Sequence, residues 1–180
     1  MFSQSRFRFP TCALLPLVLL GFVAACTTDK ARQWACPATN FVYDLDHMTV
    51  FADGAVGDLT DIRFDAQLTN LSALCNFERD RLVMDIAFQV IASRGPANRD
   101  DEAAMTYFLA IADETGGIIA KETFGTILPF KGNLRRVSIK ETFEPTIPYP
   151  AGPNILGNYR VLIGFQLTPE QVAYNRARRR

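Results

Sequence analysis

The amino-acid sequence predicts an all-β protein, an antiparallel sandwich of about seven strands followed by a short C-terminal helix. Several segments alternate apolar and polar residues with the period of two that gives a strand one buried face. Turn-forming residues recur at intervals of roughly ten positions, and apolar residues at helical spacing are rare. Two other architectures stay open: a small closed barrel, and an α+β domain in which residues 104–113 are helical.

The first strands are expected to be short. Residues 40–43 and 48–51 have the composition of strand pieces, and residues 52–58, rich in Gly and Asp, form a loop. The clearest alternation follows in residues 62–69, which predicts a strand with one solvated face. Residues 70–72 are expected to bend the chain before a further strand piece.

The middle of the chain is expected to contain the most buried strand. Residues 82–93 carry apolar side chains at both alternating sets of positions, which is typical of a strand covered on both faces. Residues 104–113 fit strand alternation and also a helical stripe, but the turn sequence at 115–117 favours a strand and a hairpin. Residues 118–130 are then the returning strand, with Gly125 as the expected bulge.

The last part of the chain combines two strands, a proline-rich crossing and a helix start. Residues 136–143 are expected to form a strand, and the prolines between 145 and 153 predict a stiff, extended crossing with no long ladder. Residues 159–167 alternate strongly and form the last strand. Thr168, followed by Pro and by Gln three residues on, predicts a helix of about one or two turns.

Leu156 and Tyr159, which precede the last alternating segment, resemble the tyrosine corner of immunoglobulin-like and fibronectin-type domains. The resemblance implies an immunoglobulin-like or fibronectin-like sandwich. Domains of this class often serve as adhesion and assembly modules.

The N-terminus has the parts of a secretory signal peptide. Arg6 and Arg8 precede an apolar run over residues 13–23, which has about half the residues needed to cross a bilayer as a helix. The sequence Val23-Ala24-Ala25-Cys26 resembles the lipobox of bacterial lipoproteins. This resemblance implies that Cys26 is lipidated, becomes the first mature residue and holds the chain at a membrane. A plain cleaved signal and a short uncleaved anchor are the alternatives.

The lipobox resemblance also implies a location. Thr27 rather than Asp follows Cys26, which implies the periplasmic face of the outer membrane, with the inner membrane as the alternative. Cys36-Pro37 and residues 164–168 resemble segments of proteobacterial envelope lipoproteins. The expected organisation is a lipoprotein signal peptide at 1–25, a tether at 26–35, the β-sandwich at 36–175 and a basic tail at 176–180.

The mature chain has the size of one domain and is nearly neutral. Removing residues 1–25 of the 180 leaves 155, enough for one hydrophobic core. The signal takes Arg6 and Arg8 and no acid, so 17 basic residues of the 19 remain against 19 acidic ones, a net charge of −2. We therefore expect no nucleic-acid partner. The arginines of the basic tail either bind anionic lipid head groups or form a solubilising tail.

Cys36 and Cys75 are expected to form a disulfide. Cys12 leaves with the signal and Cys26 takes the lipid, which leaves an even pair in an oxidising compartment. Closing a loop of about 40 residues stabilises a fold by roughly 4 kcal/mol in the chain-entropy model. The competing hypothesis is an enzyme with a reactive thiol at Cys75 and the single histidine, His47, as its base.

Residues for other chemistry are scarce, so we expect no catalytic residue, metal site or cofactor. One histidine cannot build a multi-His zinc site, and the Gly-x-Ser-x-Gly and P-loop motifs are absent. The expected function is that of a non-enzymatic, lipid-anchored binding or scaffold protein of the bacterial envelope, which docks on a protein partner through a sheet edge or face. The alternative is a calcium- or small-ligand-binding lipoprotein that uses the acidic loops from Asp44 to Asp61.

Overall fold

The computed structural model of the protein describes residues 34–52, 57–149 and 152–178. The chain divides into the units Met1–Arg32 and Gln33–Arg180, and all of these residues belong to the second unit. The expected signal peptide, the lipidated Cys26, most of the tether, Asp53 and the last two arginines lie outside the described residues.

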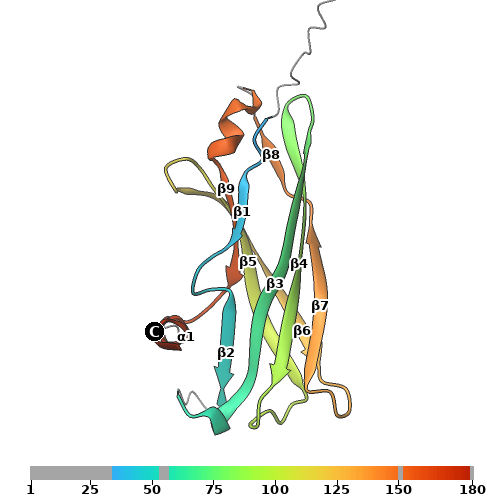
Figure 1. The fold of residues 1–180 in the computed structure, drawn as a ribbon, viewed down its shortest axis with the longest axis vertical. Helices are drawn as coiled ribbons and strands as arrows, with labels where there is room; N and C mark the ends of the chain where they lie inside the picture. Colours follow the sequence, from blue (N-terminus) through green and yellow to red (C-terminus); the bar gives the residue numbers. More distant parts are fainter. Residues whose placement is uncertain (1–33, 53–56, 150–151, 179–180) are drawn as a thin grey trace, which may run out of the picture. The chain divides into compact units, whose positions relative to one another are not determined.

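Two β-sheets face each other and form a sandwich (Figure 1). Sheet A has the strand order β1-β9-β5-β6, and sheet B has the order β2-β3-β4-β7, with β8 also paired to β4. Neighbouring strands are antiparallel except for β1 and β9. The prediction of an all-β sandwich is confirmed. Sheet A comprises β1 (Ala38–Phe41), β5 (Glu102–Ala112), β6 (Ile118–Pro129) and β9 (Arg160–Phe165); sheet B comprises β2 (His47–Phe51), β3 (Ile62–Phe77), β4 (Arg81–Arg94), β7 (Arg136–Phe143) and β8 (Thr146–Pro148).

The described residues form nine strands, more than the expected seven. β1 and β2, with 4 and 5 residues, lie near the strand pieces expected at 40–43 and 48–51, whereas β8, with 3 residues, was not expected. β8 lies within the proline-rich crossing, where three residues still pair with β4. β2, β3 and β4 are consecutive neighbours in one sheet. The ABED and CFG sheets of constant-type immunoglobulin domains contain no such run of three.

The hydrophobic core lies between the sheets and follows the alternation of the sequence. On β4, every second side chain from Leu82 to Ala92 is buried, whereas those between them are partly buried or exposed. The expectation that both faces of this strand are covered is wrong, because only the face toward sheet A packs in the core. The ring of Phe88, 1% exposed, contacts the rings of Phe41 and Tyr107 in sheet A and of Phe143 in sheet B. Burying a large apolar side chain contributes about 1.5–3 kcal/mol, so this aromatic cluster stabilises the packing of one sheet on the other.

β3 and β4 form a long hairpin that differs from the expected one. The bend predicted at residues 70–72 is a bulge inside one continuous strand, and the register of β3 against β4 shifts there. Asn70 adopts a φ of 53°, a conformation that Asn reaches more readily than most residues. The bulge absorbs the extra residue, so the ladder resumes and carries Cys75 to a position where it bonds to Cys36.

Residues 104–113 form a strand, as favoured above, and pair with β6 as a hairpin. The carboxylate of Asp113 accepts hydrogen bonds from the backbone N–H groups of Thr115 and Gly117, both at 2.9 Å, and closes the turn. The prediction of a bulge at Gly125 is wrong, because Gly125 pairs regularly with Thr106. The register shifts next to the turn instead, where Ile119 of β6 is left unpaired.

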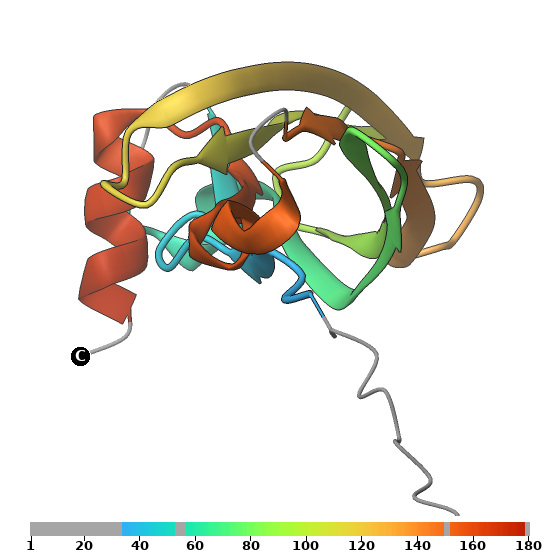
Figure 2. The same ribbon diagram turned by 90° about the horizontal axis from the view of Figure 1, so that it is seen from above.

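Helix α1 (Pro169–Arg178) follows β9 and lies beside β2 (Figure 2). It begins with the predicted capping box, in which Gln171 N donates to Thr168 Oγ1 and Thr168 N donates to Gln171 Oε1. The helix has 10 residues, longer than expected, and includes three residues of the predicted basic tail. Short 3-10 helices lie at Leu59–Asp61 (η2) and Pro153–Asn158 (η3).

Candidate binding site at an open edge of the sandwich

Each sheet ends in two edge strands, and the four edges differ in how they are protected. β1 has only four residues and directly follows the disulfide-bonded Cys36. β2 is covered by α1, where the ring of Phe51 meets that of Tyr174 edge-on at a centroid distance of 5.1 Å. Short length and a covering helix are two of the devices by which proteins keep edge strands from pairing with other chains.

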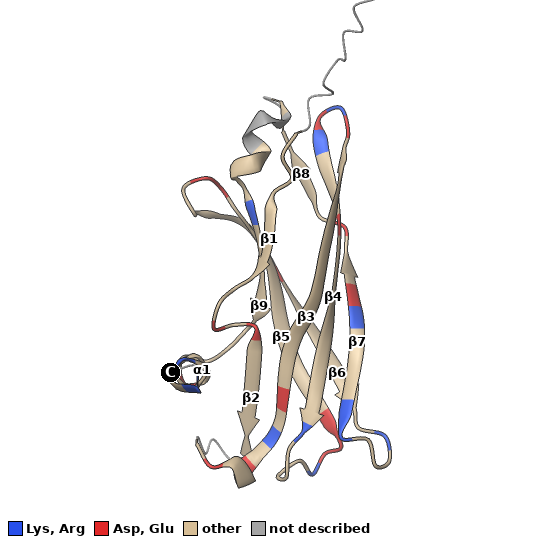
Figure 3. Ribbon diagram, in the orientation of Figure 1, with Lys and Arg blue, Asp and Glu red and all other residues tan. Residues whose placement is uncertain are grey.

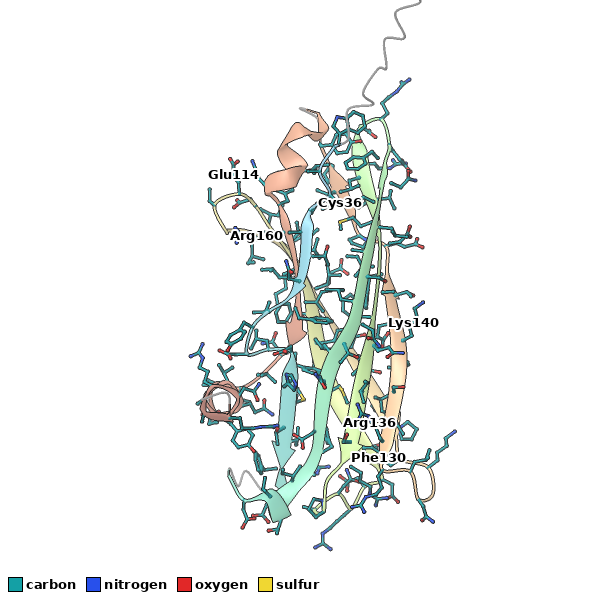
Figure 4. All side chains as sticks on the ribbon, in the orientation of Figure 1. Cys36, Glu114, Phe130, Arg136, Lys140 and Arg160 are labelled. Atoms are coloured by element: carbon teal, nitrogen blue, oxygen red, sulfur yellow. A yellow bond between two sulfur atoms is a disulfide. The ribbon has the colours of Figure 1, made fainter. Side chains whose placement is uncertain are left out.

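The edge formed by β7 and β8 is interrupted and charged. Pro145 separates the two strands, and Pro148 ends the second. Arg136 and Lys140 project from the exposed positions of β7 (Figures 3 and 4). Proline and charged side chains both oppose the addition of another strand. This edge is therefore protected as well.

β6 is the unprotected edge. It has 12 residues, its only proline is the last one, and within the described part of the chain it pairs with β5 alone. Most of its side chains are exposed, including three isoleucines. Their exposed fractions are 54% for Ile118, 53% for Ile119 and 60% for Ile127. A long, exposed, partly apolar edge strand is a ready template for pairing with another chain.

The register shows which backbone groups of β6 reach this free edge. The carbonyl of Thr106 on β5 accepts a hydrogen bond from Gln166 N, and so points toward β9. Backbone groups alternate in direction along a strand. The even-numbered residues of β5 therefore direct their N–H and C=O groups toward β9, and the odd-numbered residues direct theirs toward β6. The β6 residues opposite the even-numbered positions direct their N–H and C=O groups outward. They are Lys121, Thr123, Gly125 and Ile127.

An apolar cleft opens between β6 and the β7–β8 edge, with a volume of about 280 Å³. The side chains of Leu109, Ile111 and Phe124 line it from sheet A, and Phe143 lines it from sheet B. The rings of Phe124 and Phe143 lie 4.6 Å apart between centroids. Glu122 on β6 and Glu144 just after β7 also line the cleft, and both are exposed.

A buried tyrosine contacts both aromatic residues that line the cleft. Tyr107 stacks on Phe124 at 5.8 Å and is 3% exposed. Burial raises the pKa of Tyr107 well above its ordinary value of 10.0, and the charge and hydrogen bond of the Glu141 carboxylate raise it further. The phenol therefore stays neutral at physiological pH and donates to Glu141, which fixes both side chains.

One cation, Lys121, also lines the cleft, and its ammonium group has other partners. Lys121 Nζ donates to Gln166 Oε1 at 3.0 Å and lies 4.5 Å above the ring of Phe108. Phe108 pairs with Thr123, so its side chain lies on the opposite face of the sheet from those of Glu122 and Phe124. The carboxylates of Glu122 and Glu144 form no ion pair among the described residues. The mouth of the cleft is therefore acidic.

One carboxylate of the acidic segment considered for calcium, that of Asp44, holds α1. Arg176 Nε lies 3.0 Å from Asp44 Oδ2, and the amide of Asn175 donates to the carbonyls of Asp44 and His47 at 2.8 and 2.7 Å. Arg178 donates to Thr49 Oγ1 at 3.1 Å. In the described part of the chain, no group of three or more His, Cys, Asp or Glu side chains is placed to hold a metal ion.

The remaining sequence-based sites have mixed outcomes. The disulfide between Cys36 and Cys75 is confirmed, with Cα atoms 6.1 Å apart. The hypothesis of a reactive Cys75 thiol with His47 as base is wrong, because the sulfur of Cys75 is bonded to that of Cys36. His47 Nδ1 lies 3.1 Å from Asp46 Oδ2 at the start of β2. Asp58 caps η2, and hydrogen bonds from Thr60 lower the pKa of its carboxyl group.

Comparisons with known proteins add no assignment. A comparison with protein-family models gave no match, and comparisons with curated proteins and with solved structures gave no significant match. Among the described residues, no helix is long and apolar enough to span a membrane.

Sequence reasoning did not identify the cleft. One signal was present: Glu122 falls in the same alternation as Phe124 and Leu128, which face the core. A charged residue in register with core positions indicates a place where the core is open to solvent. Whether the strand that carries it is an edge depends on long-range pairing, which local sequence does not reveal.

Proposed function

We propose that the protein is a non-enzymatic binding or scaffold protein of the bacterial cell envelope, tethered to a membrane through lipid on Cys26. In this proposal it faces the periplasm from the outer membrane and captures a segment of an envelope protein on β6. One observation carries the proposal: β6 is long and open, whereas the other edges are short, covered or interrupted.

Two features support the location. The sequence Val23-Ala24-Ala25-Cys26 has the lipobox pattern, and a basic and apolar segment precedes it. The bond between Cys36 and Cys75 is of the kind that persists in oxidising compartments such as the periplasm. A domain held by lipid at one end meets partners in a restricted volume, so a modest intrinsic affinity suffices for capture.

Strand addition is the mode of binding that fits β6. In this mode an extended segment pairs its backbone with the free edge, and alternate side chains enter pockets beside it. The outward N–H and C=O groups of Lys121, Thr123, Gly125 and Ile127 provide the backbone partners. The cleft beside Phe124 provides a pocket.

The test is photo-cross-linking in intact host cells, with a photoreactive residue at position 127 of the full-length protein. We expect discrete protein adducts that Thr123→Pro removes, because Thr123 directs its N–H to the free edge and not to β5. Ser138→Pro is the matched control. By the same reasoning from the bond of Arg94 N to Arg135 O, Ser138 directs its N–H outward from β7. Adducts that survive Thr123→Pro, or the absence of adducts, would contradict the proposal.

A further inference from the structure

We propose that the segment captured on β6 is cationic: an extended peptide that places Lys or Arg beside Glu122 and Glu144 and an apolar side chain in the cleft. This inference rests on the proposed function and specifies the chemistry of the partner.

The position of the cleft relative to the edge sets the geometry. Glu122 pairs with Leu109 and Phe124 pairs with Tyr107, so both β6 side chains are in register with residues whose side chains face between the sheets. Glu144 approaches from the opposite side, directly after β7. A strand added to β6 would extend sheet A across the mouth of this cleft. Alternate side chains of that strand would point to the same side as Glu122 and Phe124.

Charge selects the partner. The mouth carries Glu122 and Glu144, and Lys121 also lines the cleft, but its ammonium group contacts Gln166 and the ring of Phe108. An acidic segment would place like charges together at this site, whereas Lys or Arg would pair with carboxylates that have no other cation. Charges at an exposed rim set specificity and association rate more than total affinity, so the expected effect is a preference among segments.

The interior of the cleft selects an apolar side chain. Its lining combines Leu109, Ile111, Phe124, Phe143 and Pro145. Phe124, Phe143 and Pro145 are partly exposed to water in the unliganded cleft, and an inserted aliphatic or aromatic group would bury them further. The expected motif is therefore an alternating one in which basic and apolar residues share the face that points toward the cleft.

Labelled synthetic peptides test the inference on the mature, lipidated protein in detergent micelles. One peptide repeats the sequence Lys-Thr-Val-Thr, so that lysine and valine share one face of the strand, and its match carries glutamate in place of lysine. Fluorescence anisotropy should show binding of the lysine peptide about tenfold tighter, as two exposed ion pairs would produce. The double variant Glu122→Lys with Glu144→Lys should reverse the order. Asp61→Lys, which makes the charge change of one of these substitutions at η2, should leave the order unchanged.

The outcomes separate this inference from the proposed function. Equal binding of both peptides, abolished by Thr123→Pro, would overturn the charge preference and leave strand capture on β6 intact. Binding that Thr123→Pro does not affect, or no binding of either peptide, would overturn both. Sedimentation of the protein alone tests self-association. A dimer that Thr123→Pro dissociates would show that a second copy of this chain occupies the edge, and would overturn the cationic partner.

Discussion

Asp113 shows how one carboxylate determines a turn. Its Oδ1 atom accepts hydrogen bonds from Thr115 Oγ1 at 2.7 Å and from the N–H groups of Thr115 and Gly117. Gly116 takes the positive φ, 86°, that the turn requires. The turn fixes the register in which β6 returns along β5, and so determines which residues of β6 face outward.

The pKa of Asp113 should be lower than its ordinary value of 3.8, first because of the hydrogen bond from Thr115 and then because of those from Gly117 and the other turn amides. Because the pKa of Asp113 is lower in the folded protein, the unfolded chain takes up the proton at a higher pH than the folded protein does. The free energy of unfolding should therefore fall as the pH drops below about 4. A carboxyl-detected NMR titration measures the pKa directly. A value at or above 3.8 would contradict the turn geometry described here.

Tyr107 leads to a prediction at alkaline pH. Its pKa is raised by burial and by Glu141, so between pH 10.0 and that higher value the folded protein keeps a proton that the unfolded chain has lost. Stability should therefore decrease as the pH rises above about 10. Tyr107→Phe should reduce the slope of the free energy of unfolding against pH by an amount that corresponds to about one proton. Urea unfolding at a series of alkaline pH values checks it, and an unchanged slope would count against a buried, protonated phenol.

At the scale of elements, α1 acts as a cover for β2. Asn175 is 3% exposed and donates to two backbone carbonyls, while Arg176 and Arg178 reach Asp44 and Thr49. The helix thereby protects the β2 edge and leaves β6 as the open one. The arginines that the sequence suggested for lipid or solvent are in part structural, because two of them bind groups of the sandwich.

Asn175→Ala should lower the free energy of unfolding by about 1–3 kcal/mol, because it leaves buried carbonyl groups without their donor. Urea denaturation measures the change. Ala173→Ser, at an exposed position of the same helix, should stay within about 0.5 kcal/mol of the parent. Equal effects of the two substitutions would mean that the helix does not depend on this contact.

The elements that local sequence predicts well are those with local causes. The alternation of β3 over residues 62–69, the hairpin turn at Asp113 and the capping box at Thr168 all arise from residues close in the chain. The continuation of β3 past Asn70 was not predictable in this way, since a bulge is stabilised by the opposing strand. The length of α1 beyond Tyr174 depends on partners about 130 residues away.

At the scale of the molecule, the disulfide ties the start of the domain to the far half of β3. It joins residues 39 positions apart, and the ring of Trp34 packs beside it on Phe77 at a centroid distance of 5.4 Å. The segment that leads to the expected lipid anchor is thereby joined covalently to sheet B. A pull on the N-terminal segment would therefore act on a linked strand rather than on a free end.

Reduction of the bond between Cys36 and Cys75 should lower the free energy of unfolding by about 2–4 kcal/mol. Urea denaturation with and without a thiol reductant measures the difference. The double variant Cys36→Ser with Cys75→Ser is the control: its stability should match that of the reduced protein and should not respond to the reductant. No loss on reduction would mean that the bond adds nothing to the fold.

Sequence patterns predicted the sandwich as a whole but not its topology. Residues 108–112 of β5 are all buried, and β5 lies inside sheet A with β9 on one side and β6 on the other. This central place is set by pairing between segments that are distant in the sequence. The placement of β6 at an edge arises from the same long-range pairing. The candidate site is thus a property of strand order. The only sign of it in the sequence is the charged residue Glu122 at a position in register with core residues.

Residue-resolved amide exchange along β6 tests the open edge most directly. In the free protein, the amides of Lys121, Thr123, Gly125 and Ile127 should exchange rapidly, whereas those of the residues between them should be protected by β5. Addition of the valine–lysine peptide should protect the outward amides selectively. Uniform protection of β6 in the free protein, or no change in its outward amides on binding, would contradict the account.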